Sequence, residues 1–359
     1  MRSVISCAGI GNPLLSARSI RRVGSLAWVI EVAELVRARG ARASLCVLRD
    51  GRVLIDHSCG GPPDGLFWIF SASKPFAALL VHRLAVAGVL ELDAPVARYW
   101  PEFAGGGKSA VTIRHVLAHR SGFATARGFA LDALAMSDWP RAVQAIERAT
   151  LRWRPGEVTA YQPIVYGHIL GELVRRATGA PVAAVLRSEV LGPLGLSDTH
   201  LGLPDRLWGR HVPIRGHGLG GPPTARMVNR RSVRRAVIPA AGISTTARDL
   251  ARFYQALLDG FSREAVTEAR RPSGDAVLDR TIGTRIRWAH GFQLGGAGRP
   301  MGSLSARETF GHNGSNCCIA WADPGRRLVF AYLTDRIVAG HSAAAHLGEV
   351  ADAVLKACD

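Results

Sequence analysis

The stretch FGHNGSNCCIAWADPGRRLVFAYL, residues 310–333, decides the fold. It contains two apolar runs, and the sequence Asp323-Pro324-Gly325 separates them. Runs of this length and composition form strands, and Asp, Pro and Gly together form tight turns. The stretch therefore predicts two antiparallel strands near the C-terminus of the chain.

A second pair of strands is predicted near the other end of the chain. In SLCVLRDGRVLIDH, residues 44–57, the pair Asp50-Gly51 stands between two apolar runs. Asp-Gly pairs favour the two-residue turns that join hairpin strands. One helix is predicted before these strands in the sequence and one after them, because residues 25–39 and 342–357 carry apolar side chains at helical spacing. Gly40 ends the first of these helices.

Helical patterns and long loops dominate the middle of the chain, from about residue 71 to residue 260. We therefore predict an α/β (α+β) fold. One antiparallel sheet is built from N- and C-terminal strands, terminal helices cover it, and a mainly helical region is inserted between the strands. A cleft is expected where the helical region meets the sheet, since small-molecule sites favour such junctions.

The domain organisation follows from these elements. Residues 1–24 are predicted to be an N-terminal extension, and residues 25–357 a single folded unit. Within that unit we expect a sheet subdomain, about 25–70 and 285–357, and a helical subdomain, about 71–284. No repeat divides the chain, and no linker is rich enough in Pro, Gly or Ser to separate independent domains.

Composition excludes several classes of function. The 359-residue chain has a net charge of +17, but its basic residues are scattered and form no basic helix or aromatic-interleaved patch, so we expect no nucleic-acid partner. No apolar run approaches the 18 residues or more of a membrane span, so we expect no membrane partner. The N-terminus is too weakly apolar for a secretory signal, which favours a cytoplasmic location with reduced thiols. The six cysteines show no metal spacing, so we expect no metal and no cofactor: Cys7, Cys46, Cys59, Cys317, Cys318 and Cys358.

The first chemical signal is FSASKPFAALL, residues 70–80, which holds one of only three lysines in the chain. If a helix begins near Ser71, then Ser71 and Lys74 lie on the same face, three residues apart. Pro75 supports that start, because a proline in the first helical turn loses little. Lys74 could simply extend its charge to solvent from a core helix. Alternatively, the apolar surroundings lower its pKa enough for it to take the proton of Ser71.

Two further segments carry candidate residues. In LRWRPGEVTAYQPIVYGHIL, residues 151–170, Tyr161 stands between a Pro-Gly turn and a helix. Its phenol could point into a cleft and share a proton with Lys74, or it could be an ordinary core aromatic. At the entrance of a predicted strand, residues 312–315 read His-Asn-Gly-Ser. Exposed backbone N–H groups there could stabilise an oxyanion, or His312 could be an ordinary surface histidine.

In the order and separation of these three segments, the chain resembles the serine β-lactamase and penicillin-binding superfamily, most closely its class C and esterase branch. VTIRHVLAHRSGF (111–123), VLGPLGLSDTHLG (190–202) and AAGISTTARDLARFYQALLDG (240–260) extend the resemblance, which covers residues from about 25 to 357. It implies a β-lactamase/transpeptidase-like fold and acyl transfer through an acyl-serine.

The resemblance also implies roles for individual residues. Ser71 matches the nucleophile of the S-x-x-K motif, Lys74 its partner, and Tyr161 the tyrosine of Y-x-N. The backbone N–H groups of Ser71 and Ser315 would form the oxyanion hole. The remaining residues are expected to contact the substrate: His312, Asn313 and Gly314, which match the K-T-G motif, together with Gln162 and Trp153.

Two departures from the family pattern bear on the substrate. Pro163 replaces the asparagine of Y-x-N, so a side-chain amide that contacts the acyl group in the family is missing. Gln162 next to it could supply an amide, although from an adjacent position that points elsewhere. His312 replaces the lysine of K-T-G, and a neutral imidazole holds the carboxylate of a β-lactam less well than a permanent cation does. The motif H-x-G resembles esterase and transesterase members instead.

The sequence therefore predicts an enzyme that cleaves a small carboxylic ester and passes the acyl group to water, or to an amine or alcohol in a biosynthetic pathway. β-Lactamase or D-amino-acid peptidase activity is the alternative. A catalytically silent binding protein is a more remote one. The identity of donor and acceptor and the oligomeric state stay open. The Gly- and Pro-rich basic segment 203–236 is expected to form a loop near the cleft that shapes the choice of acceptor.

Overall fold

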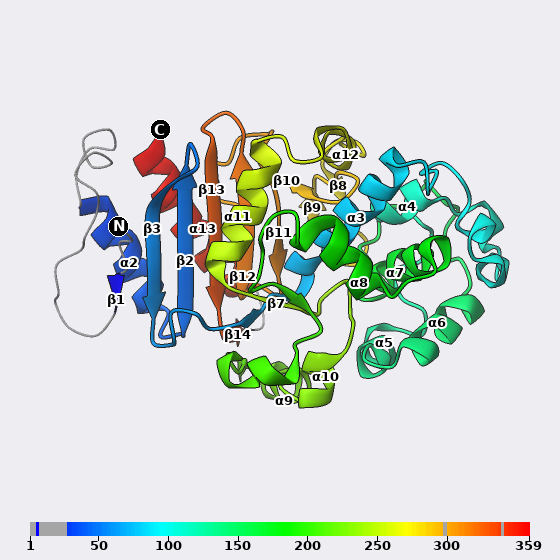
Figure 1. Cartoon of the computed structure of the whole chain (residues 1–359), viewed down its shortest axis with the longest axis horizontal. Helices are drawn as coiled ribbons and strands as arrows, with labels where there is room; N and C mark the ends of the chain where they lie inside the picture. Colours follow the sequence, from blue (N-terminus) through cyan, green and yellow to red (C-terminus); the bar gives the residue numbers. More distant parts are fainter. Residues whose placement is uncertain (1–4, 7–26, 297–299, 339–340) are drawn as a thin grey trace.

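The computed structural model describes residues 5–6, 27–296, 300–338 and 341–359. Most of the predicted extension 1–24, including Cys7, lies outside these residues. A seven-stranded sheet forms the left half of the molecule in Figure 1, in the order β1-β3-β2-β13-β12-β11-β10. The six strands from β3 to β10 are antiparallel, whereas the two-residue β1 pairs in parallel with β3. The bounds of these strands are Ile5–Ser6 (β1), Ala43–Arg49 (β2), Arg52–Cys59 (β3), Gln293–Leu294 (β10), Phe310–Gly314 (β11), Cys318–Asp323 (β12) and Leu328–Thr334 (β13).

The predicted sheet, built from both ends of the chain, is confirmed. The β2–β3 turn has positive φ at Asp50 (50°) and Gly51 (72°), which matches the expected two-residue hairpin. The β12 and β13 strands are antiparallel, and their pairing runs from the Cys318–Leu333 pair to the Asp323–Leu328 pair. The chain between them turns at the predicted Asp-Pro-Gly sequence.

Helices cover both faces of the sheet. The terminal helices α2 (Ala27–Ala38) and α13 (His341–Cys358) pack on one face, and α11 (Ala247–Leu258) lies across the other (Figure 1). Alternation along the strands supplies both cores: Leu45 and Val47 of β2 face the terminal helices, and Cys46 and Leu48 face α11. The terminal helices therefore cover the sheet as predicted, and α11 adds a cover on the other face.

The rest of the chain forms the mainly helical half on the right of Figure 1. The central helix α3 (Lys74–Val86) follows the 3₁₀ turn η1 (Phe70–Ser73) and contacts α7, α8 and α12. The other α-helices are α4 (Ile113–Leu117), α5 (Phe129–Ala135), α6 (Trp139–Arg148), α7 (Val165–Thr178), α8 (Val182–Leu186), α9 (Gly221–Val228), α10 (Arg231–Arg235) and α12 (Arg263–Ala269). Short 3₁₀ and π turns are η2 (Val96–Arg98), η3 (Pro101–Ala104), η4 (Lys108–Ala110), η5 (Arg187–Leu191) and η6 (Asp205–Arg210).

Three small sheets complete the fold. The first has the order β4-β7-β5, with β4 at Phe67–Trp68, β5 at His200–Leu201 and β7 at Ile243–Thr245. In the second, β6 (Arg215–His217) pairs with β14 (Arg336–Val338), and in the third β8 (Val277–Leu278) pairs with β9 (Arg285–Ile286). Because β4 ends just before η1, pairing between β4 and β7 places the start of α3 next to the chain around residue 243.

The subdomain boundaries stay a prediction, although α11, within the range 71–284, packs on the large sheet. The segment 203–236 is not a plain loop, because it contains η6, β6, α9 and α10. No helix in the described part of the chain is long and apolar enough to cross a bilayer.

Candidate active site

Ser71 lies in η1, directly before the long helix α3. Phe70, the preceding residue, has φ of +47°, a left-handed conformation that is uncommon for a bulky side chain and costs energy. Backbone pairing holds the turn in place: the Ile69 N–H donates to the Ile243 carbonyl (3.0 Å), and the Ser73 hydroxyl accepts from the Ile243 N–H (3.1 Å). The serine is therefore presented from a strained but well-supported turn.

Lys74 is fully buried beneath Ser71, at 1% exposure. Its Nζ lies 3.1 Å from Ser71 Oγ, 2.9 Å from the Pro163 carbonyl oxygen and 3.2 Å from the Ala240 carbonyl oxygen. Burial alone lowers the pKa of Lys74 well below its usual value of 10.5. A neutral amine has two N–H groups and one lone pair. The two carbonyls can only accept, so they use both N–H groups, and the lone pair is left for the Ser71 hydroxyl.

Two glycines allow these close approaches. A Cβ on Gly167, in α7, would overlap the backbone nitrogen of Ala240, so only glycine lets the Ala240 carbonyl come this near to Lys74. A Cβ on Gly314 would overlap the Ile69 carbonyl oxygen, which lies two residues before Ser71. Gly314 therefore brings the end of β11 against the turn that carries the serine.

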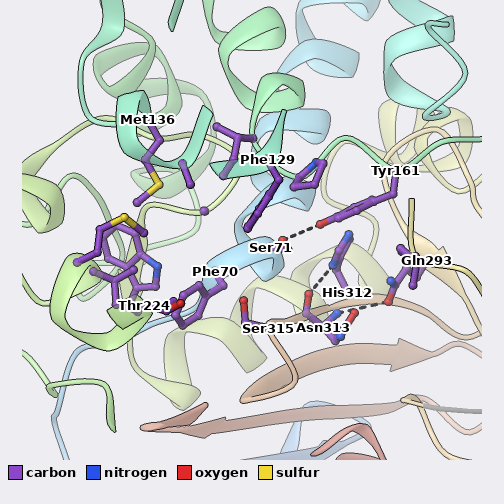
Figure 2. A pocket seen from close by; sticks show the side chains of 18 residues that line it. Phe70, Ser71, Phe129, Met136, Tyr161, Thr224, Gln293, His312, Asn313 and Ser315 are labelled. Carbon is purple, nitrogen blue, oxygen red and sulfur yellow. Dashed lines mark hydrogen bonds between the residues drawn. The ribbon is translucent and has the colours of Figure 1, made fainter. Parts of the chain in front are cut away.

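The Tyr161 side chain also points toward Ser71 (Figure 2). Its hydroxyl donates to Ser71 Oγ at 2.6 Å, and its ring stacks on Trp288 with centroids 5.3 Å apart and planes at 5°. Burial, more than any other cause, raises the pKa of Tyr161 above its usual value of 10, and the charge of Asp279 adds to this. Tyr161 is therefore a neutral donor. The Ser71 hydroxyl can accept from it and donate to Lys74 at the same time.

His312 is buried, not a surface residue, and lines the same cavity. Burial first, and then the charge of Lys74, lower its pKa to about 3, so its imidazole is neutral near pH 7. Its Nδ1 lies 2.6 Å from the carbonyl oxygen of Asn313. A carbonyl only accepts, so Nδ1 carries the proton and the buried Nε2, which has no hydrogen-bond partner, is an acceptor.

Ser315 follows β11 and lines the cavity beside Ser71 (Figure 2). It has φ of +44°, and Asn316 after it has φ of +51°. Of the two residues whose N–H groups were predicted to form an oxyanion hole, Ser315 has a positive φ itself, and Ser71 follows a residue, Phe70, that has one. Gly314 does not line the cavity itself.

The cavity has a volume of about 310 Å³, and its walls are mostly apolar. None of the described residues that line it is Asp, Glu, Lys or Arg. Met136 and Thr224 lie on one side of Ser71, and Gln293, His312 and Asn313 on the other (Figure 2). The lining residues are Trp68, Phe70, Ser71, Phe129, Ala133, Met136, Tyr161, Pro163, Ile164, Thr224, Met227, Val228, Ala241, Ile282, Gln293, His312, Asn313 and Ser315.

Besides Gly314, two more predicted substrate contacts need correction. Gln162 is completely buried and Trp153 is half-buried, and neither lines the cavity. Gln162 follows Tyr161 directly, and its backbone N–H donates to Nδ1 of the buried His119 ring. The segment 203–236 does lie at the cavity, as expected, but through one side of helix α9, with Thr224, Met227 and Val228.

Sequence reasoning missed Gln293, which lines the same cavity as Pro163. The Asn313 N–H donates to Gln293 Oε1 at 3.4 Å, which directs the amide nitrogen away from that contact. No local motif indicates this residue, because its position depends on the pairing of β10 with β11. No cluster of potential metal ligands occurs among the described residues.

The chain is similar to known proteins in both sequence and fold. The chain matches the family described as Beta-lactamase over residues 32–355. It is 29% identical to the esterase/beta-lactamase LipL of Mycobacterium tuberculosis, over 86% of this chain and 80% of LipL. It is 31% identical to the esterase EstB of Burkholderia gladioli, over 82% and 83%. The crystal structure of a family VIII carboxylesterase superposes with a TM-score of 0.78 at 28% identity, over 91% of this chain and 96% of that chain.

The fold and the buried site define the class of protein, a serine hydrolase. The chain belongs to the β-lactamase family.

Proposed function

We propose that this protein is a carboxylesterase that forms an acyl-enzyme on Ser71 and takes small, uncharged, largely apolar esters. The observation that carries the proposal is the continuous chain of hydrogen-bonding groups from Tyr161 through Ser71 to Lys74. Ser71, the middle group of this chain, lines a cavity in which none of the described lining residues carries a charge. The likeness to the esterases LipL and EstB supports the same activity.

The acylation step follows from the geometry. Ser71 Oγ attacks the ester carbonyl carbon while its proton passes to the neutral Nζ of Lys74, 3.1 Å away. The backbone N–H groups of Ser71 and Ser315 stabilise the negative charge on the former carbonyl oxygen. When the tetrahedral intermediate collapses, the alcohol leaves with the proton that Lys74 holds, relayed by the Tyr161 hydroxyl. Deacylation repeats these transfers with water as the nucleophile, and the proton returns to Ser71.

The uncharged cavity argues for a neutral substrate. A β-lactam or a peptide C-terminus brings a carboxylate, which is best held by a permanent cation, and His312 is neutral. Its Nε2 can accept a hydrogen bond from a hydroxyl or an N–H group of the substrate. The amide nitrogen of Gln293 offers a donor on the same side of Ser71, and the two methionines Met136 and Met227 provide an adaptable apolar wall.

Water suffices as the acyl acceptor, so turnover does not require an alcohol or an amine. Transfer to an alcohol or amine is the second candidate, and the apolar walls favour it, since they lower the amount of water near the acyl-serine.

The test begins with a fluorophosphonate probe and peptide mapping, which should find the adduct on Ser71 alone. Turnover of p-nitrophenyl butyrate and of the cephalosporin nitrocefin is then compared, and we expect the ester to be the better substrate by at least about a hundredfold. Product analysis with added alcohols and amines distinguishes hydrolysis from transfer. An adduct on another serine would refute the assigned nucleophile, and faster turnover of nitrocefin would favour β-lactamase activity.

A further inference from the structure

Asp279 is a completely buried carboxylate between β8 and β9, and it faces the backbone of Tyr161. It accepts hydrogen bonds from four N–H groups, and all four donors are neutral. They are the backbone N–H groups of Tyr161, Thr281 and Ile282 and the indole Nε1–H of Trp288. Burying a carboxylate is costly unless it is hydrogen-bonded, and here N–H groups alone, rather than an arginine or lysine, satisfy it.

The donors are divided between the two carboxylate oxygens. Oδ1 accepts from Thr281 (2.9 Å) and Ile282 (3.1 Å), and Oδ2 accepts from Trp288 Nε1 (3.0 Å). The Tyr161 N–H lies between the two oxygens, at 3.1 and 3.0 Å. Both oxygens are therefore needed as acceptors, and an amide in this place would direct its NH₂ group at an N–H donor whichever way it turned.

These bonds join three parts of the site. Asp279 holds the backbone of Tyr161 and, through Nε1, the Trp288 ring that stacks on Tyr161. It also caps the turn that carries Ile282, which lines the cavity and is 40% exposed at its mouth. A second bond, from the Arg280 N–H to the Thr159 carbonyl (3.0 Å), ties the same turn to the chain that leads to Tyr161.

We propose that Asp279 is a positioning residue, which fixes the Tyr161–Trp288 pair so that the Tyr161 hydroxyl stays within hydrogen-bond distance of Ser71, and which joins this pair to the wall of the cavity at Ile282. This inference rests on the proposed function, because Tyr161 is there the proton relay. Asp279 does not touch the substrate. Its effect on the rate passes through Tyr161, whose hydrogen bond to Ser71 is drawn in Figure 2.

The test is Asp279→Asn, measured alone and in a Tyr161→Phe background. Alone, we expect kcat for p-nitrophenyl butyrate to fall about 10- to 100-fold with little change in KM, because displacement of a catalytic group by a fraction of an ångström is costly. In the Tyr161→Phe background, which lacks the hydroxyl to be positioned, the same substitution should change kcat less than about threefold. Equal losses in both backgrounds would overturn the proposal.

Asp249→Asn is the matched control. Asp249 is a buried carboxylate in α11 that accepts from the Asp198 N–H (2.8 Å), the Thr199 hydroxyl (3.2 Å) and, unlike Asp279, also an arginine, Arg252 (3.4 Å), and it does not line the cavity. We expect this variant to lose stability, measured by thermal unfolding, and to keep kcat per folded molecule. A loss of kcat as large as that of Asp279→Asn would show a general effect of buried carboxylates and overturn the proposal.

Trp288→Phe covers the case in which Asp279→Asn does not fold. It keeps an aromatic ring against Tyr161 but removes the Nε1–H donor together with part of the indole ring system. We expect kcat to fall several-fold in the otherwise native protein and to stay unchanged in the Tyr161→Phe background; a fall in both would count against Asp279 acting through Tyr161. If the native protein turns over no ester at all, the proposed function fails first, and that result is distinct from an altered response of these variants.

Discussion

Two of the three lysines, Lys74 and Lys108, are buried, and one of the three hydrogen-bond partners of each differs in kind. The ammonium of Lys108, in η4, donates to three carbonyls, those of Gly105, Glu147 and Ala149. Lys74 has two carbonyls, and the Ser71 hydroxyl is its third partner. Three acceptors match the three N–H groups of an ammonium, whereas two acceptors and a hydroxyl match a neutral amine with a free lone pair.

The electrostatic surroundings point the same way. Burial lowers the pKa of both lysines, but for Lys108 the charge of Glu147 acts in the opposite direction. For Lys74 burial is the only cause, and the pKa falls well below its usual value. A buried lysine thus stabilises the fold when three carbonyls accept its three N–H groups, as at Lys108. It is a candidate base when only two carbonyls accept and its lone pair can take a proton from a hydroxyl, as at Lys74.

The largest expected effect on activity comes from removing the Ser71 hydroxyl, the partner that Lys74 has and Lys108 lacks. Ser71→Ala should abolish ester turnover, because nucleophilic catalysis ends when the nucleophile is lost. The fold should be unchanged, as judged by circular dichroism and thermal unfolding. Turnover within tenfold of the native rate would show that Lys74 serves some other group.

The two lysines can be compared directly through Lys74→Met and Lys108→Met. We expect Lys74→Met to lower kcat by about 10³-fold, in the range of general base catalysis, with a small change in stability. Lys108→Met leaves three buried carbonyls without a donor and should lower the free energy of unfolding by about 2 kcal/mol. Its kcat per folded molecule should stay within about twofold of the native value. If both variants lost activity alike, the distinction between them would be wrong.

The pH dependence of kcat/KM tests the state of Lys74. The active form has a neutral Lys74 and a protonated Tyr161, so activity falls as the pH drops below the lowered pKa of Lys74. It should persist to above pH 10, because the pKa of Tyr161 is raised. With its pKa at about 3, His312 should add no limb near pH 6.5. An acid limb close to pH 10.5 would mean that Lys74 is an ammonium, like Lys108.

The smallest effect is expected from His312→Lys, which places another lysine in the site. A lysine cannot accept a hydrogen bond when charged, and its charge would be unpaired among apolar walls, so ester turnover should fall by no more than about tenfold and should not rise. Turnover of nitrocefin should stay below that of the ester. A gain in ester turnover, measured beside the native enzyme, would show that the neutral acceptor at this position is not used.

Local sequence predicted most of the fold because its signals are local. The Asp50-Gly51 turn, the Asp323-Pro324-Gly325 turn and the apolar spacing of the terminal helices each depend on a few neighbouring residues. The S-x-x-K spacing likewise placed Ser71 and Lys74 on one helical turn, 3.1 Å apart. The resemblance to a known family added Tyr161, His312 and Ser315, which the structure brings to the same cavity.

The tertiary structure decided what lies far apart in sequence. The Lys74 amine meets the carbonyls of Pro163 and Ala240, 89 and 166 positions away, and these contacts decide whether it is charged. Asp279 meets Tyr161 across 118 positions, and Gln293 enters the cavity through strand pairing. The sequence alone determined the elements and the class of chemistry expected of Ser71, since both rest on local spacing. Protonation state, cavity walls and support of Tyr161 were set only by folding, because they depend on burial and on partners that no local pattern specifies.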